Sequence, residues 1–136
     1  TAPGYLGSRR PVTVYRARDE NDDLGVVFYP VIADGYNSQI ELAVAITRDG
    51  TIAGVRVIRE TETEELGDQV NQNNSDWILS FTDKSYDNVP KEQWRVESEG
   101  GYFDQISGAT ITSRSVINSV RNTLDYHAIS DDALYK

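Results

Sequence analysis

Apolar and polar positions alternate in the first half of the chain, which is the pattern of half-buried β-strands. A first strand is predicted where the alternation begins, over residues 12–15. A longer apolar run follows over residues 24–33. Pro30 restricts that run to an edge, a bend or a turn of the sheet, because proline donates no ladder hydrogen bond.

A β-hairpin is the clearest local prediction. The apolar side chains of residues 40–46 share one face, and Asp49-Gly50 supplies a turn that requires positive φ. The second strand covers about residues 52–58, and an acidic stretch follows it.

Two shorter elements are predicted further on. Ser75 is placed to cap a short helix that carries Trp77 and Phe81. Alternation returns over residues 92–99, which predicts a strand with Trp94 on its apolar face. The Gly-Gly pair directly after this stretch is expected to end the strand.

The last segment changes to a helical period. Val116, Ile117, Val120 and Leu124 share one face, which predicts an amphipathic helix over about residues 113–126. The pattern therefore indicates an α+β fold with a single domain, in which a mainly antiparallel sheet with hairpins packs against a few helices, including this C-terminal one.

Composition limits what this domain can do. We expect a flexible lead-in over residues 1–10 and one domain over residues 11–136. The net charge of −9 argues against nucleic acid as a partner, and the absence of cysteine excludes disulfides and thiolate metal sites. No stretch approaches the roughly 20 apolar residues of a membrane span. Because the chain begins at Thr1 without an initiator Met, an anchor could precede it.

Common catalytic and metal-binding patterns give no match. The lone His127 falls near the end of the last predicted helix, where a cation is favourable, and it has no triad or zinc partners in the sequence. A solvated loop is predicted for five acidic residues that lack the calcium-loop pattern: Glu60, Glu62, Glu64, Glu65 and Asp68.

A dense run of small and hydroxylated residues precedes the last helix. It consists of Ser107, Gly108, Ala109, Thr110, Thr112 and Ser113. Small residues allow a ligand to approach the backbone, and the N–H groups at a helix start favour a phosphate. A simple turn followed by an N-cap explains the same pattern, so the residues alone leave both interpretations open.

The run Asp104-x-x-Ser107-Gly108-Ala109-Thr110 resembles the flavinylation motif of bacterial FMN-binding domains. The resemblance implies FMN joined through its phosphate to the hydroxyl of Thr110. A separate flavin transferase, with FAD as donor, would make this bond. Ser107 and Gly108 would shape the loop, and Asp104 would support the motif or its recognition by the transferase.

The resemblance extends over roughly residues 36–121 and is greatest to the G subunit of Rnf (Rsx) electron transport complexes, which is related to the C subunit of sodium-pumping NADH:quinone reductase. Members usually carry Glu-Thr-Pro-Gly-Leu-Gly near the flavin, and this chain has Glu-Glu in place of Pro-Gly. The cofactor-binding residues that the resemblance implies are Thr110, Ser107, Gly108, Ala109, Thr112, Asp104, Glu62, Thr63, Leu66 and Gly67.

The resemblance implies an electron-transfer flavoprotein domain with no catalytic residues or metal ligands of its own. The whole protein would have an N-terminal membrane helix and a periplasmic domain in the bacterial inner membrane. It would relay electrons among the other subunits of a complex that couples ferredoxin and NAD redox to ion movement. Two alternatives remain: a domain that binds FMN noncovalently, and a non-redox extracytoplasmic binding or assembly module.

Overall fold

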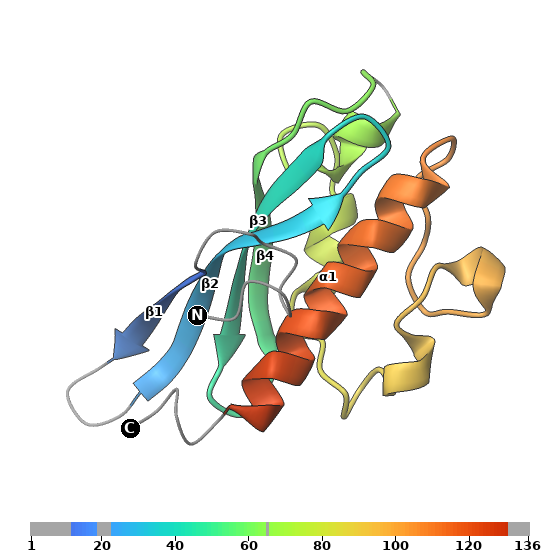
Figure 1. The fold of residues 1–136 in the computed structure, drawn as a ribbon. Coiled ribbons are helices and arrows are strands. Elements are labelled where there is room, and N and C mark those ends of the chain that lie inside the picture. Colours follow the sequence, from blue (N-terminus) through green and yellow to red (C-terminus); the bar gives the residue numbers. More distant parts are fainter. Residues whose placement is uncertain (1–11, 19–22, 65, 131–136) are drawn as a thin grey trace.

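Four antiparallel strands form the framework of the molecule (Figure 1). The computed structural model describes residues 12–18, 23–64 and 66–130. The strands are β1 (Thr13–Arg18), β2 (Asp23–Asp34), β3 (Gln39–Thr47) and β4 (Ile52–Arg59). Each strand pairs with the next along the chain, so the sheet is a meander in the order β1-β2-β3-β4.

The predicted hairpin is confirmed as β3 and β4. The apolar residues of β3 that face the core are buried, and Gly50 adopts a φ of 91°, as the Asp-Gly turn requires. The Asp49 carboxylate accepts hydrogen bonds from the Thr51 N–H and the Thr47 hydroxyl, which stabilises the turn. Turn chemistry and strand periodicity therefore agree at this position.

Pro30 lies within β2, which is an internal strand and not an edge. The register of β2 against β3 shifts between Phe28 and Val31, and the pairing with β1 extends only to Tyr29. The proline therefore occupies an irregularity in the ladder where its missing N–H is tolerated; of the predicted edge, bend or turn, the structure has an irregularity within an internal strand.

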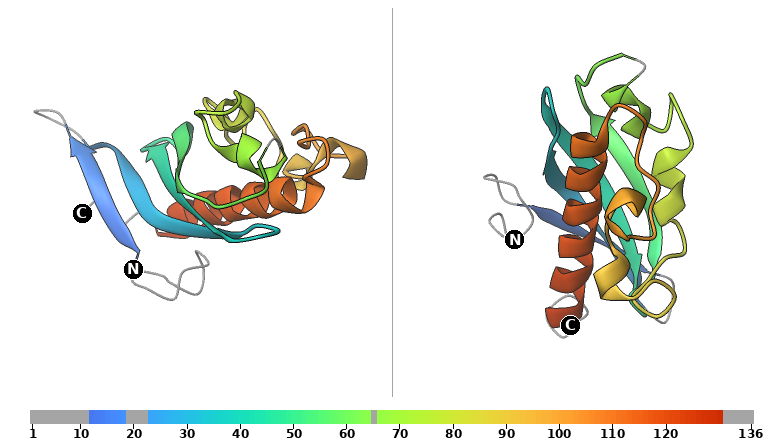
Figure 2. Two further views of the ribbon diagram at one scale, coloured as in Figure 1. Left: turned by 90° about the horizontal axis from the view of Figure 1, so that it is seen from above. Right: turned by 90° about the vertical axis from the view of Figure 1, so that its right-hand side faces the viewer.

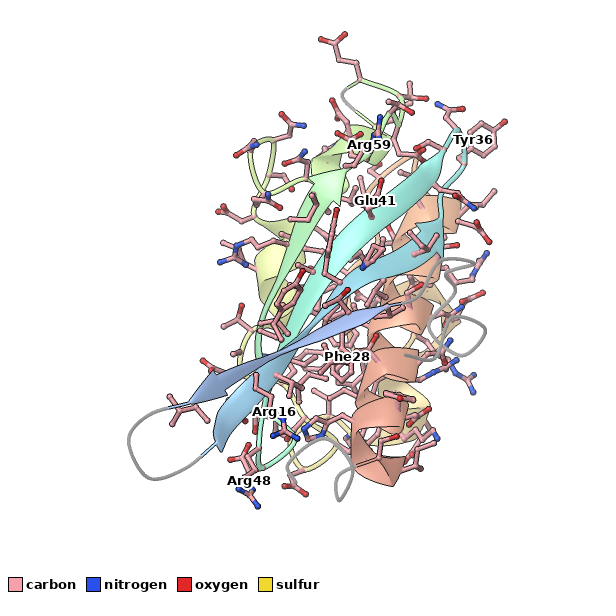
Figure 3. The ribbon with its side chains drawn as sticks, turned by 60° about the vertical axis from the view of Figure 1, so that its left-hand side comes forward. Arg16, Phe28, Tyr36, Glu41, Arg48 and Arg59 are labelled. Atoms are coloured by element: carbon pink, nitrogen blue, oxygen red, sulfur yellow. The ribbon has the colours of Figure 1, made fainter. Side chains whose placement is uncertain are left out.

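One long helix, α1 (Thr110–Ile129), covers one face of the sheet (Figures 1 and 2). Its buried apolar side chains join those of the strands in one core. Figure 3 shows Phe28 between the sheet and α1. Its ring packs edge to face against the ring of Tyr126, with 5.9 Å between the two ring centroids. These features confirm the single-domain α+β fold.

Among the described residues, most side chains on the other face of the sheet are exposed or partly exposed, and we call this face the open face. Arg56 is exposed there, and Glu41 and Arg59 lie next to each other on the same face, 3.7 Å apart (Figure 3). The Tyr29 hydroxyl donates to the Glu41 carboxylate at 3.3 Å.

Short 3₁₀ helices fill the segment between β4 and α1: η1 (Gly67–Val70), η2 (Trp77–Phe81), η3 (Lys91–Gln93) and η4 (Glu97–Glu99). The predicted short helix corresponds to η2, and the Ser75 hydroxyl accepts the Trp77 N–H at 3.1 Å. Within the described ranges, no helix combines the length and apolar character needed to cross a bilayer.

The strand predicted over residues 92–99 is wrong. Trp94 and Val96 are buried, as the alternation indicated, but the Trp94 N–H bonds to the Lys91 carbonyl within a local turn. Only an isolated bridge joins Val96 to Phe103. Burial on alternate residues therefore arises here without a neighbouring strand to pair with.

Candidate functional site

A cavity of about 450 Å³ opens where the β2–β3 loop, the loop after β4 and the start of α1 meet. It is lined by Tyr36, Glu62, Thr63, Leu66, Gly67, Gly108, Ala109, Thr110, Ile111 and Thr112. Its volume is within the usual range of small-molecule sites. Residues far apart in the sequence thus form one candidate site.

The hydroxyl-rich motif forms the turn that leads into α1. The Ala109 N–H bonds to the Ile106 carbonyl at 2.9 Å, and Gly108 adopts a φ of 77°, which favours glycine. The helix begins at Thr110, three residues before its predicted start. Ser113 therefore lies inside the first turn, where its buried hydroxyl accepts the Ile106 N–H and donates to the Ala109 carbonyl, both at 2.9 Å.

The first turn of α1 presents unused donors to this region. Among the described residues, the backbone N–H groups of Thr110, Ile111 and Thr112 have no hydrogen-bond acceptor. Thr112 is fully buried, so an orphaned N–H there is costly unless a ligand or water accepts it. These donors and the helix dipole favour an anionic group.

Three threonines line the cavity, and they differ in what their hydroxyls bind. The Thr63 hydroxyl accepts a hydrogen bond from the Asn37 side-chain amide, and the Thr112 hydroxyl donates to Glu62 at 2.8 Å. The Thr110 hydroxyl makes no hydrogen bond within the described part of the chain. Thr110 therefore combines a position at the helix start with an uncommitted nucleophilic oxygen.

Glu62 departs from the predicted solvated loop, since it is only 8% exposed. Its carboxylate accepts hydrogen bonds from the N–H groups of Tyr36 at 2.7 Å and Asn37 at 3.1 Å and from the hydroxyls of Ser38 at 2.6 Å and Thr112 at 2.8 Å. One side chain therefore connects the β2–β3 loop to the first turn of α1.

The same contacts determine the protonation state of Glu62. Burial favours the neutral acid, but the hydrogen bonds from Ser38, Thr112, Tyr36 and Asn37 outweigh it, so the pKa is lowered from its ordinary value of 4.5. Two glycines make room for the carboxyl group and its stem. A Cβ on Gly35 would lie 2.5 Å from a Glu62 oxygen, and one on Gly67 would lie 2.8 Å from the Glu62 Cβ.

Eight of the ten residues predicted to bind a cofactor line this cavity: Glu62, Thr63, Leu66, Gly67, Gly108, Ala109, Thr110 and Thr112. Ser107 and Asp104 are exposed and do not line it. Asp104 lies beside Glu97, and a hydrogen bond and the negative charge of Asp104 raise the Glu97 pKa. Glu64 is also exposed, and Glu65 lies outside the described residues.

Tyr36 and Ile111 line the cavity but were not among the predicted site residues. Tyr36 is in the loop between two predicted strands, and only the tertiary fold brings that loop to the helix start. Ile111 lies inside the motif, where an apolar residue between two threonines was the available signal.

The aromatic residues between η2 and α1 mostly belong to the core. Trp94 and Phe103 are buried, and their rings pack against Phe81. Trp77 is half-buried, and its indole N–H donates to the Asp104 carbonyl at 2.7 Å. His127 is buried in the last turn of α1.

The sequence of this chain is similar to those of known proteins. The family model described as "FMN-binding domain" matches residues 35–125. A protein from Pseudoalteromonas atlantica, named as the G subunit of an ion-translocating oxidoreductase complex, is 38% identical over 135 residues, which is 99% of this chain and 63% of that protein.

Proteins of the same name give similar matches. The one from Shewanella amazonensis is 38% identical over 88% of this chain and 55% of its own length. The one from Vibrio cholerae O395 is 36% identical over 89% of this chain and 58% of its own length. The chain thus spans less than two thirds of these relatives. Since the family model covers the cavity and most of α1, the chain belongs to the FMN-binding domain family.

Proposed function

We propose that this chain is an electron-transfer domain that carries FMN covalently, through a phosphoester bond to Thr110. Membership of the FMN-binding domain family supports FMN as the cofactor. The observation that carries the attachment site is the uncommitted Thr110 hydroxyl, which lines the cavity at the start of α1.

The residues of the cavity fit such a group. Backbone N–H groups of Thr110, Ile111 and Thr112 are available to an anionic phosphate. Gly108 leaves space that a side chain would fill, because a Cβ there would lie 2.9 Å from Leu66 Cδ2. These features match a phosphate-bearing ligand held close to the backbone.

Each part of the cavity has a different role in this proposal. Thr110 provides the attachment, while the exposed apolar side chains of Tyr36, Leu66 and Ile111 are available to cover a flat ring. Glu62 acts by positioning the loops, since its oxygens are already hydrogen-bonded to the chain. Attached FMN supplies redox chemistry that the side chains of this domain do not provide.

The remaining residues of the motif act during maturation. We assign Ser107 and Asp104, which are exposed outside the cavity, to recognition of the motif by a separate flavin transferase. In the transfer, the Thr110 hydroxyl loses its proton and its Oγ forms the new bond to phosphorus. The pyrophosphate bond of FAD breaks, and AMP leaves. The chain therefore gains the mass of FMN less one water.

The larger protein is proposed to be a subunit of an ion-translocating oxidoreductase complex. The names and greater length of the relatives support this assignment. In this proposal residues 11–136 form the FMN domain on the periplasmic side, and an N-terminal helix anchors this domain in the inner membrane. The complex couples electron transfer between ferredoxin and NAD to ion movement.

Intact mass spectrometry tests the attachment. After co-expression with a flavin transferase and denaturation, we expect the wild-type chain to carry one FMN less water. Thr110→Ala should remove this adduct completely. Thr61→Ala changes an exposed threonine outside the cavity and should leave the adduct intact.

Three outcomes would count against this proposal. An unmodified wild-type chain in the presence of active transferase would remove the covalent assignment. An adduct that persists in Thr110→Ala would show that another residue is the attachment site. Flavin absorbance that co-purifies but is lost on denaturation would indicate a noncovalent FMN domain instead.

A further inference from the structure

A second, positively charged groove lies beside α1, separate from the cavity. It has a volume of about 320 Å³ and is lined by Arg95, Glu99, Arg114, Asn118 and Arg121. We call it the arginine groove. Arg114, Asn118 and Arg121 come from α1, while Arg95 and Glu99 come from the segment around η4 that runs alongside it (Figure 2).

The groove concentrates positive charge on a chain whose net charge is −9. Arg114 is neutralised by Glu99, to which it donates two hydrogen bonds of 3.2 and 3.0 Å. Arg95 and Arg121 have no ion-pair partner among the described residues. One carboxylate therefore faces three guanidinium groups, and two of these are available to a ligand.

The length of the groove along α1 indicates the shape of the ligand. Arg114 and Arg121 are separated by about 10 Å along the axis of α1, at about 1.5 Å per residue. Side chains on one face of an extended chain recur every second residue, about 7 Å apart, so two carboxylates of one such segment can reach different guanidinium groups of the groove. A single phosphate is too small to span this distance, and Glu99 would repel a compact dianion near Arg114.

We propose that the arginine groove docks an extended, acidic segment of a protein partner. Guanidinium groups pair with carboxylates through two parallel hydrogen bonds, which suits recognition of such a segment. On a strongly acidic chain, a local positive groove also orients an approaching acidic partner.

The groove begins close to the proposed cofactor site. Arg114 follows Thr110 by four residues, so the two lie on the same face of α1, about 6 Å apart along the axis. A partner in the groove would lie beside Thr110. A role of the docked partner in electron transfer to or from FMN rests on the proposed function, whereas the docking itself does not.

Zero-length crosslinking in the full-length protein, within its native membranes, tests the docking. Arg95→Lys and Arg121→Lys each keep the charge and introduce an amine that carbodiimide joins to a carboxylate in direct contact. We expect both variants to form a crosslink, absent from the wild type, to the same acidic segment of another protein. Arg56→Lys is the matched control on the open face of the sheet and should form none to that segment.

Two results would overturn the proposal. The first is the absence of intermolecular crosslinks from both groove variants above the Arg56→Lys background. The second is Arg95- and Arg121-dependent binding of the purified chain to inorganic phosphate or to phosphatidylglycerol vesicles, which would identify a free anion or a lipid headgroup as the ligand. Intact mass of the same samples reports FMN on Thr110 separately, so failure of one proposal does not conceal failure of the other.

Discussion

Glu62 is the residue on which the shape of the cavity most depends. Its carboxylate accepts hydrogen bonds from the β2–β3 loop and from Thr112 on α1. Glu62→Gln replaces one acceptor oxygen with an amide that faces donors, so buried N–H or hydroxyl groups lose their partner. We expect a loss of about 1–3 kcal/mol of unfolding free energy, measured by urea denaturation at neutral pH. An unchanged midpoint would contradict this role.

The pH dependence follows from the lowered pKa of Glu62. The folded chain holds this carboxyl ionised more strongly than the unfolded chain does. Its contribution to stability is therefore complete above the ordinary value of 4.5 and is lost as the pH falls through the lowered folded pKa. The difference in unfolding free energy between wild type and Glu62→Gln should therefore shrink as the pH falls below 4.5. A constant difference would show that Glu62 does not titrate as inferred.

Gly108 allows a separate test of close approach in the cavity. Gly108→Ala should lose about 1 kcal/mol of stability, because its φ is positive. It should also reduce the FMN bound per chain, because the new Cβ would displace Leu66. Gly50→Ala has a similar backbone cost, with a φ of 91° and open space around its Cβ. This control should lose stability but keep full FMN loading, and equal loading of both variants would contradict the role of Gly108.

At the scale of elements, Ser113 joins the motif turn to α1. Its buried hydroxyl is the acceptor for the Ile106 N–H. Ser113→Ala leaves that donor without a partner, and we expect a loss of about 1–3 kcal/mol in urea denaturation. Ser115→Ala, in the same helix, should cost less than about 0.5 kcal/mol, since its hydroxyl has no hydrogen-bond partner among the described residues. Equal losses would mean that Ser113 acts only through helix propensity.

Periodicity predicted the elements well where neighbours along the chain pair with each other. The hairpin is an example, because the Asp-Gly turn determines its register locally. The same reasoning failed over residues 92–99, where Trp94 and Val96 are buried in the apolar core without an adjacent strand. Alternation records burial, and it predicts a strand only if a partner strand is available.

For the whole molecule, one core cluster joins the sheet, α1, η1 and η2 with residues of the loops between them. Trp94 is fully buried with Phe81 and Phe103, and these residues belong to the same apolar core as the sheet and α1. We therefore expect one cooperative transition in urea, with coincident midpoints from tryptophan fluorescence and far-UV circular dichroism. Separate midpoints would indicate that the 3₁₀ segment unfolds independently of the sheet.

The sequence by itself determined the four strands of the sheet, the hairpin turn, the C-terminal helix and the motif that contains Thr110, since each of these depends on residues close together in the chain. Only the tertiary structure decided that Tyr36 reaches the helix start, that the buried Glu62 joins the β2–β3 loop to α1 and that Arg95 and Arg121 line one groove. The contacts of Tyr36 with Glu62 and Thr112 join residues 26 and 76 positions apart. The three-dimensional packing of β2, β3 and α1, which local patterns do not encode, brings such segments together.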